Sequence, residues 1–538
     1  MEKFNQKKLI KRFALAAAVA AVFLGSCSKP AELSGGNEYS GKAPKYIFLF
    51  IGDGTSIPQR NAAELFLASE NNPKNMDYAV LREEDRFPKD NGVTDFKPTI
   101  QRMLMSGFPG QGFSSTYSAN SLITDSSSSA TAIATGKKTR DGVVSMDPDA
   151  KEDYYAITKM ARDKGLKVGI VTTVSLDHAT PAAFYANSPH RNFYYEIAKQ
   201  IPESQFNYFG GGGFKQPRGP KGEDPDVGGI LTAAGYKVLN TRADFDNIKS
   251  GDDKIITSNP VLDGDSAMPY AIDQRDGEIR FSEFIAKGIE VLDNPKGFFM
   301  MAECGKVDWA CHANDAVAAV NDVLTLDAGV KVAYEFYLKH PDDTLIIVTG
   351  DHETGGLAIG FAGTKYDAFL TKFKHQKGSY LAFNKVLAEF KQSNPNAKFE
   401  DSLPLIEDFF GLKKYSKAEI ATLNEEAKKG SVEALDKLGM ALKDYELADL
   451  SRAFAITMKD PASRPTSDDE YYLSYGYYEP FTVTLTHILD QKAGVAWTTY
   501  SHTGLPTPVS VIGVGHKLFD GYFDNTDIFK KVAAIGKL

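Results

Sequence analysis

The sequence is poor in cysteine, with three among 538 residues, and it carries no excess of positive charge. So few cysteines exclude a disulfide-built scaffold. The 61 Lys and Arg residues stand against 70 Asp and Glu, a formal net charge of −9 without strong clustering, which argues against a nucleic-acid-binding surface. A hydrophobic content of 42% and a charged content of 24% are ordinary for a globular protein and exclude disorder or a collagen-like chain. The length allows a large α/β core with an insertion.

The first 26 residues differ in character from the rest. A basic start precedes an unbroken apolar run of 12 residues, 13–24. That run is too short for a bilayer, which needs about 20 residues, but it suits a signal-peptide core. The text that follows, Leu24-Gly25-Ser26-Cys27, resembles a bacterial lipobox. It predicts a lipoprotein-type signal peptide over 1–26, a lipid anchor on Cys27 and a tether over 27–43; the alternative is an ordinary secretion signal with an incidental cysteine.

Both versions of this N-terminus predict an exported protein, in the periplasm or on the outer surface. The two remaining cysteines, Cys304 and Cys311, are seven positions apart in a stretch that we interpret as helical. A rise of 1.5 Å per residue places their Cα atoms about 10 Å apart. That separation exceeds the reach of a disulfide, so none is predicted.

Apolar runs of strand length recur along the chain, and polar residues follow them. The runs YIFLFIGDG (46–54), KVGIVTT (167–173), GFFMMAE (297–303) and TLIIVTG (344–350) lead into Asp53, Asp177, Glu303 and Asp351, while VSVIGVG (509–515) follows His502. Continuous apolar strands separated by helical stretches indicate a mostly parallel sheet covered on both faces, an α/β fold. In such sheets the chemistry lies beyond the carboxyl ends of the strands, where these polar residues stand.

Residues 365–480 form a segment of different composition. Much of it is rich in Lys, Glu and Ala, and it closes with the aromatic run YYLSYGYY (471–478). We expect a mostly helical insertion that interrupts a catalytic domain over 44–364 and 481–538. For the aromatic run, packing of the insertion onto the core is favoured over ligand stacking.

Paired His and carboxylate residues provide candidate metal ligands. Asp308 and His312 are spaced i, i+4, which puts both on one helical face. Asp351 and His352 lie at a strand end, and His502 precedes another strand. Any one of these pairs is weak evidence for a metal site. Together with Asp53 they supply the mixed nitrogen and oxygen ligand sets that Zn²⁺ accepts. Two such sets indicate a two-metal hydrolase.

The stretch TDSSSSATAIATG (124–136) predicts a helix with Thr124 or Asp125 near its N-cap and Gly136 at its C-terminal end. A serine in the first turn of a helix faces free backbone N–H groups and the positive end of the helix dipole, which suits a phosphate group. A nearby metal ion would lower the pKa of that serine and make it a nucleophile. Arg191 could add a bidentate contact to two phosphate oxygens.

These segments, in this order, resemble the bacterial and animal alkaline phosphatases. The matching texts are IGDG, TDSSSSATAIATG, DHATPAA, the arginine at 191, ECGKVDWACH, VTGDHETGG and SHTG. The resemblance covers roughly 44–364 and 481–520. It implies a three-layer α/β/α fold with a central mostly parallel sheet, and the hydrolysis of small phosphate monoesters.

The resemblance also implies roles for single residues. Ser126 would be the nucleophile that becomes a phosphoserine, Arg191 would bind the phosphoryl group, and Asp125 would orient Arg191. Two Zn²⁺ ions and one Mg²⁺ ion would be bound: the first Zn²⁺ by Asp308, His312 and His502, the second by Asp53, Asp351 and His352, and the Mg²⁺ by Asp53, Thr180 and Glu303.

Two positions depart from the enterobacterial pattern. His178, a neighbour of the third metal site, replaces an aspartate there, as it does in animal members. Because imidazole suits Zn²⁺ or Co²⁺ better than Mg²⁺, this change bears on the identity of the third ion. Trp309, beside the phosphate, stands where enterobacterial members have a lysine and animal members a histidine. It either loosens product binding or packs beside the site.

Two other functions stay open from the sequence alone. A phosphodiesterase of the same superfamily would usually carry Thr as its nucleophile and lack the pair at Thr180 and Glu303. A non-catalytic surface lipoprotein would be expected to have lost a ligand, and none is missing. The sequence leaves open whether the protein is a monomer or a homodimer, and what the 365–480 insertion does.

Overall fold

The computed structural model describes residues 41–71, 101–365 and 367–538. Within these ranges no helix is long and apolar enough to cross a membrane. The predicted signal peptide, the proposed anchor Cys27 and most of the 27–43 tether lie outside the described residues.

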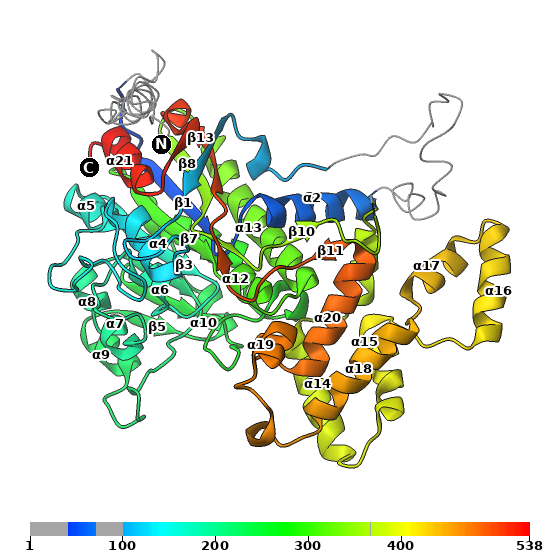
Figure 1. Cartoon of the computed structure of the whole chain (residues 1–538). Coiled ribbons are helices and arrows are strands. Elements are labelled where there is room, and N and C mark those ends of the chain that lie inside the picture. Colours follow the sequence, from blue (N-terminus) through cyan, green and yellow to red (C-terminus); the bar gives the residue numbers. More distant parts are fainter. Residues whose placement is uncertain (1–40, 72–100, 366) are drawn as a thin grey trace, which may run out of the picture. The chain divides into compact units, whose positions relative to one another are not determined.

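A ten-stranded sheet forms the centre of the described chain (Figure 1). Its strands lie in the order β14-β2-β13-β8-β1-β7-β3-β4-β6-β5. Their bounds are β1 Tyr46–Gly52, β2 Gly110–Ser115, β3 Lys167–Thr172, β4 Tyr208–Gly211, β5 Lys237–Leu239, β6 Ile255–Ser258, β7 Phe298–Cys304, β8 Thr344–Gly350, β13 Thr507–Gly513 and β14 Gly521–Asp524. From β8 to β5 every neighbouring pair is parallel. The predicted α/β fold with a mostly parallel sheet is confirmed.

The four long apolar runs of the sequence form neighbouring central strands. Every residue of β1, β7 and β8 is buried, and so is β3 after its first residue. Strands with apolar residues on both faces need cover on both sides. The fifth run differs, because β13 is antiparallel to both β8 and β2. Its beginning therefore lies at the carboxyl edge of the parallel strands, with Val509 of β13 beside Thr349 of β8.

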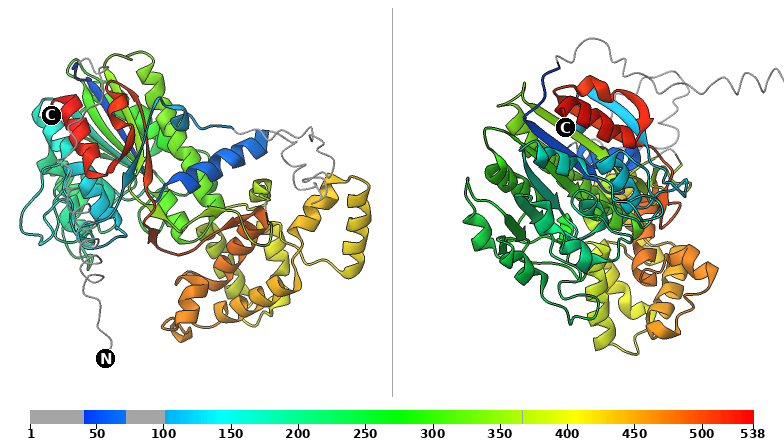
Figure 2. Two further views of the ribbon diagram at one scale, coloured as in Figure 1. Left: turned by 45° about the horizontal axis from the view of Figure 1, so that its top comes forward. Right: turned by 90° about the vertical axis from the view of Figure 1, so that its left-hand side faces the viewer.

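Helices cover both faces of the sheet (Figures 1 and 2). On one side α13 contacts β1, β7 and β8, and it packs against α2 and α11; on the other, α5 and α6 contact β3 and β7, and α4 packs against α6 and α21. The bounds of these helices are α2 Ile57–Asn71, α4 Ser126–Thr135, α5 Ile157–Asp163, α6 Ala179–Ala182, α11 Phe281–Leu292, α13 Ala316–Tyr337 and α21 Thr526–Gly536. Along the chain, four further helices lie in the connections from β3 to β6: α7 Tyr194–Ala198, α8 Ile201–Ser204, α9 Val227–Ala233 and α10 Arg242–Asp246.

In the segment between the short strands β10 (Ala358–Ile359) and β11 (Val495–Ala496), the described residues form helices joined by turns and no strand. It contains α14 Tyr380–Ser393, α15 Leu403–Phe410, α16 Lys417–Lys428, α17 Val432–Met440, α18 Asp444–Thr457, α19 Asp469–Tyr475 and α20 Pro480–Ala493. The boundaries of the proposed insertion, 365–480, stay a prediction.

The aromatic run of this segment packs against the loop that leads to His502. The rings of Tyr472 and Tyr478 lie 6.1 and 6.4 Å from that of Tyr500, and the Tyr500 hydroxyl donates to the Ser474 carbonyl. Aromatic pairs at such distances stabilise beyond their buried area. The contacts agree with the expectation that this run packs onto the core.

Cys304 and Cys311 do not lie on one helix, contrary to our interpretation of the sequence. Cys304 ends strand β7, and only Cys311 lies on a helix, α12 (Lys306–His312). The strand predicted over GFFMMAE extends by one residue, because Cys304 pairs with Gly52 of the buried strand β1. Both cysteines are buried and free, as predicted.

A buried carboxylate in α13 makes stability depend on pH. Asp322 is 2% exposed and accepts a hydrogen bond from the Ala271 backbone, and burial raises its pKa from 3.8 to about 7. A carboxyl whose pKa is raised on folding stabilises the protein fully below its unfolded pKa, and that stability is lost as pH rises through about 7. We expect Asp322→Asn to gain thermal stability relative to wild type by a few kcal/mol between pH 5 and pH 8. Melting temperatures of both proteins at the two pH values test this, and an unchanged difference would contradict it.

Candidate active site

The predicted serine helix exists and places Ser126 in its first turn. Helix α4 begins at Ser126, and its N-cap Asp125 accepts a hydrogen bond from the Ser128 backbone at 2.9 Å. It ends at Gly136, whose φ of 70° gives a left-handed C-cap. Of the two candidates for the N-cap, Asp125 is the one used. The Ser126 side chain therefore lies at the positive end of a buried helix, 2% exposed.

The carboxyl ends of three central strands bring the acidic candidates together. Asp53 follows β1, and Asp351 follows β8, directly beyond the paired residues Gly52 and Gly350. Glu303 lies in β7 opposite Ile51 of β1. Because parallel strands end at one edge of the sheet, residues about 300 positions apart in sequence meet there.

The first predicted metal set is assembled from α12 and the loop before β13. His312 Nε2 lies 3.3 Å from Asp308 Oδ2 and 3.2 Å from His502 Nε2. His502 Nε2 is 3.6 Å from Asp308 Oδ1. The three donor atoms converge within reach of one ion.

The second predicted set lies beside Ser126. His352 Nε2 is 3.3 Å from Asp53 Oδ1, 3.5 Å from Asp351 Oδ2 and 3.1 Å from Ser126 Oγ. Asp53, Asp351 and His352 are all fully buried. The rings of His352 and His502 stack at 3.6 Å, so the two sets are adjacent.

A third set consists of Asp53, Glu303 and His178, the residue at the N-cap of α6. Thr180, predicted for this set, is buried in α6 with its hydroxyl unpartnered. Burial raises the pKa of Glu303 to about 7, although Thr172 donates a hydrogen bond to its carboxylate. The set offers two carboxylates, a hydroxyl and an imidazole.

Buried atoms of these sets lack hydrogen-bond partners among the described residues: both carboxylate oxygens of Asp53, and Asp351 Oδ2, Glu303 Oε1, Thr180 Oγ1 and His178 Nδ1. Burying such groups unpaired costs several kcal/mol. Burial and the Asp351 carboxylate raise the pKa of Asp53 well above its usual range, and burial with the Asp308 carboxylate does the same for Asp351. This surplus of buried negative charge is what cations would neutralise, so the residues present fit metal ions.

Arg191 pairs with Asp125, the N-cap residue of the serine helix. Its Nη1 donates to Asp125 Oδ2 at 3.0 Å, and its Nη2 lies 3.4 Å from His178 Nε2. Burial tends to raise the pKa of Asp125, but Arg191 and the hydroxyl of Ser127 hold it below its usual range. Asp125 therefore stays ionised and fixes the guanidinium beside Ser126.

Trp309 is half-buried in α12. Its ring meets the edge of His178 at 5.7 Å and lies 4.7 Å from the ammonium of the buried Lys306. Trp309 thus packs beside the third set, as one of its two interpretations has it; its effect on product binding stays a prediction.

The sequence interpretation missed the groups that orient the histidines. The carbonyls of Tyr500 and Thr124 accept hydrogen bonds from Nδ1 of His312 and His502, at 2.6 and 2.7 Å. Such contacts fix the ring orientation of a ligating histidine. Backbone acceptors leave no trace in side-chain identity, so no sequence signal could have shown them.

Thr354 is a further residue that the sequence interpretation missed. Its hydroxyl donates to Asp308 Oδ1 at 2.5 Å and lies 3.3 Å from His352 Nδ1, so it contacts both predicted zinc sets. A Cβ on Gly54 would come within 2.9 Å of this hydroxyl and 2.8 Å of the Asp308 backbone. The position of Thr354, two residues after His352 on one face of β9 (Glu353–Thr354), was the available signal.

Glu353 anchors the strand pair that carries Thr354 and His502. Its carboxylate is buried and accepts hydrogen bonds from Gln59 Nε2 at 2.6 Å and the Gly356 backbone at 3.1 Å. Strand β9 pairs with β12 (His502–Thr503), so His502 lies opposite Thr354. The pairing holds the ligand-bearing segments together.

Comparisons with known proteins place the chain in a family. The family model described as "Alkaline phosphatase" matches residues 44–211 and 223–538. Alkaline phosphatase 4 of Bacillus subtilis is 25% identical over 543 residues, covering 99% of this chain and 98% of that protein. The alkaline phosphatase of Schizosaccharomyces pombe is 25% identical, covering 90% and 80%.

Solved structures agree in fold. A cold-active alkaline phosphatase from a psychrophilic Shewanella species has a TM-score of 0.66 at 25% identity, covering 91% of this chain and 99% of that one. The Thermus thermophilus alkaline phosphatase has a TM-score of 0.69 at 22% identity, covering 95% and 94%. With a family model matched from residue 44 to the last residue, apart from 212–222, and with this fold, the chain belongs to the alkaline phosphatase family.

Proposed function

We propose that this protein hydrolyses phosphate monoesters to an alcohol and inorganic phosphate, through a phosphoserine at Ser126. The observation that supports it most directly is the position of Ser126: its hydroxyl lies at the N-terminus of α4, 3.1 Å from His352, with Arg191 held nearby by Asp125. A phosphoryl group transferred to this oxygen would meet helix N–H groups and a guanidinium.

The reaction has two steps. The Ser126 oxygen attacks phosphorus, the bond from phosphorus to the ester oxygen breaks, and the leaving oxygen takes up a proton to depart as the alcohol. Water then attacks the phosphoserine, which restores the serine hydroxyl and releases phosphate. Arg191 is positioned to bind the phosphoryl oxygens in both steps, because Asp125 fixes one of its terminal nitrogens.

The donor sets support two Zn²⁺ ions, one held by Asp308, His312 and His502 and one by Asp53, Asp351 and His352. When bound, such a pair neutralises charge on the attacking and leaving oxygens of an in-line displacement. For the third set we propose Mg²⁺, because Asp53, Glu303 and Thr180 all offer oxygen. His178 is the one nitrogen donor in that set.

We also propose export and lipid anchoring at Cys27, from the basic start and the apolar run over 13–24. Whether a homodimer forms stays open. A broad range of small phosphate monoesters is expected as substrates, since Ser126 and Arg191, the residues assigned to substrate, would both contact the phosphoryl group and not the alcohol part.

Turnover of p-nitrophenyl phosphate and bis-p-nitrophenyl phosphate by the zinc- and magnesium-loaded protein tests this function. We expect strong monoester hydrolysis and diester hydrolysis weaker by about 100-fold or more, since Arg191 and the buried helix end suit a terminal phosphoryl group. A preference for the diester would make the protein a phosphodiesterase. Absence of turnover on both would leave the non-catalytic lipoprotein.

A further inference from the structure

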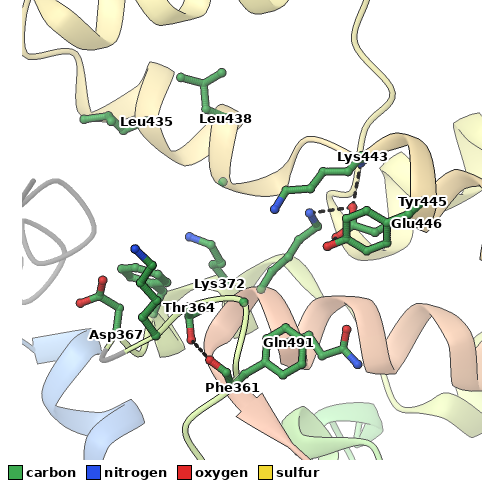
Figure 3. A pocket seen from close by; sticks show the side chains of 15 residues that line it. Phe361, Thr364, Asp367, Lys372, Leu435, Leu438, Lys443, Tyr445, Glu446 and Gln491 are labelled. Carbon is green, nitrogen blue, oxygen red and sulfur yellow. Dashed lines mark hydrogen bonds and ion pairs between the residues drawn. The ribbon is translucent and has the colours of Figure 1, made fainter. Parts of the chain in front are cut away.

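A pocket of about 460 Å³, lined by both charged and apolar side chains, lies away from the predicted ligand sets (Figure 3). Its walls are the segment 361–372 after β10, the end of α17, the start of α18 and the end of α20. None of the residues that line it belongs to the three metal sets or contacts Ser126. We name it the lysine pocket, after Lys372, Lys443 and Lys492 in its wall.

The lysine pocket is positively charged in a negatively charged protein. Four lysines and two acidic residues line it, whereas the whole chain carries a formal charge of −9. One lysine is neutralised: Lys492 Nζ lies 2.9 Å from Glu446 Oε2 and 2.9 Å from the Ala441 carbonyl. Lys372 and Lys443 are the two candidate ligand-binding lysines of the pocket.

Lys372 is the most unusual of them. Its side chain is 6% exposed, yet among the described residues no carboxylate pairs with its ammonium and no group accepts a hydrogen bond from it. The nearest compensation is the Phe369 ring, 4.8 Å away. The acid that acts on it, Asp436, is paired with His375 at 3.1 Å. Burying most of a lysine side chain without an anion beside its charge is costly.

The Lys372 ammonium lies beside a glycine, which leaves space for it. Its Nζ lies where a Cβ on Gly439 would come within 2.8 Å, so the glycine at the end of α17 leaves space for the lysine head. Lys443, from the start of α18, points into the same space from the opposite side (Figure 3). No ion pair of Lys443 is found in the described part of the chain.

Part of the wall is apolar, although Thr364, Glu446 and Gln491 also line it. Phe361, Leu435, Leu438 and the ring of Tyr445 line the pocket beside the two ammonium groups. A ligand that satisfies both features has a group with several anionic oxygens and a small apolar body. A bare inorganic anion would leave the apolar wall uncovered.

We propose that the lysine pocket is a second ligand site, which binds a small organic phosphate or phosphonate. Lys372 and Lys443 would hold its anionic oxygens, and Phe361 and Leu438 would contact its organic part. The site is separate from the catalytic one, so its ligand does not need to be a substrate.

Calorimetric titration of the full metal-loaded chain with phenylphosphonate, which cannot be hydrolysed as an ester, tests the proposal. We expect two binding sites in wild type at low salt. Lys372→Met with Lys443→Met should remove one site, or weaken it at least about 10-fold, and Arg191→Ala should remove the other. A single site that Arg191→Ala abolishes would overturn the proposal.

Two controls keep the result interpretable. Lys428→Met removes an exposed lysine of α16 paired with Glu425, and it should leave both sites intact. The double variant should melt no lower than wild type without ligand, because it removes a buried unpaired charge. It should also retain monoester turnover. Failure of the proposed catalytic function would show as absent turnover in wild type, whatever the number of binding sites.

Methylphosphonate measures the role of the apolar wall. We expect it to bind the lysine pocket at least about 5-fold more weakly than phenylphosphonate, because it lacks the ring that would cover Phe361 and Leu438. Equal affinities at this site would contradict the assignment of an organic ligand.

Discussion

Replacing Ser126 by alanine is expected to lower monoester turnover by on the order of 10³-fold or more, with little change in the fold. The Ser126 hydroxyl is the oxygen placed at the start of α4 and beside His352. Its removal leaves the helix N-terminus, the predicted metal ligands and Arg191 in place but takes away the hydroxyl that we propose accepts the phosphoryl group. Steady-state turnover of p-nitrophenyl phosphate measures the loss.

The next serine of the same helix provides a matched control. Ser127 donates to both carboxylate oxygens of Asp125, which also accepts hydrogen bonds from the Ser128 and Gly142 backbones. Ser127→Ala therefore loosens Asp125 without removing its other partners, and a loss below about 10-fold is expected. Mass spectrometry after an acid quench should find one added phosphoryl group on wild type and none on Ser126→Ala. Full turnover in Ser126→Ala would mean that another group is the nucleophile.

Local pattern was sufficient for the parts of the site that a single element defines. The cap residues of α4 are adjacent to the helix they bound, so the local sequence located Gly136 and narrowed the N-cap to Thr124 or Asp125. The i, i+4 spacing of Asp308 and His312 likewise depends only on α12. Asp53 and Asp351 followed from the rule that parallel strands end at one edge.

The pairing of strands that are distant in sequence could not be predicted from local patterns. The direction of β13 depends on its neighbours β8 and β2, which are distant in sequence, and it explains why His502 reaches the site from before a strand and not from after one. Cys304 lies in a strand because β7, buried between β1 and β3, extends one residue beyond the apolar run that predicted it.

The lysine pocket could not be predicted from local sequence patterns either. Its residues extend from Phe361 to Lys492, and only the packing of α17, α18 and α20 brings them together. In sequence each lysine belongs to a Lys-rich stretch, where a solvated helix surface is the ordinary interpretation. Burial of Lys372, which no local pattern predicts, is what distinguishes it.

Metal removal should have the other large effect. Dialysis against a chelator is expected to lower monoester turnover at least about 100-fold and to lower the melting temperature by a few degrees, both restored by Zn²⁺. Each ion held at about 100 times its Kd stabilises the folded chain by about 2.7 kcal/mol. Without cations, four buried carboxylates face one another: Asp53, Glu303, Asp308 and Asp351.

A pair of asparagine variants separates metal binding from general destabilisation. Asp53 belongs to both the second and the third set, so Asp53→Asn should lose the larger part of the melting-temperature change that the chelator causes in wild type. Asp322 is an equally buried carboxylate that belongs to neither, and Asp322→Asn should keep the full change. If both variants respond to the chelator as wild type does, the Asp53 carboxylate is not a ligand. The buried negative charge at the carboxyl edge would then need another source of compensation, because the described residues place only the Arg191 guanidinium near it, and that group already pairs with Asp125.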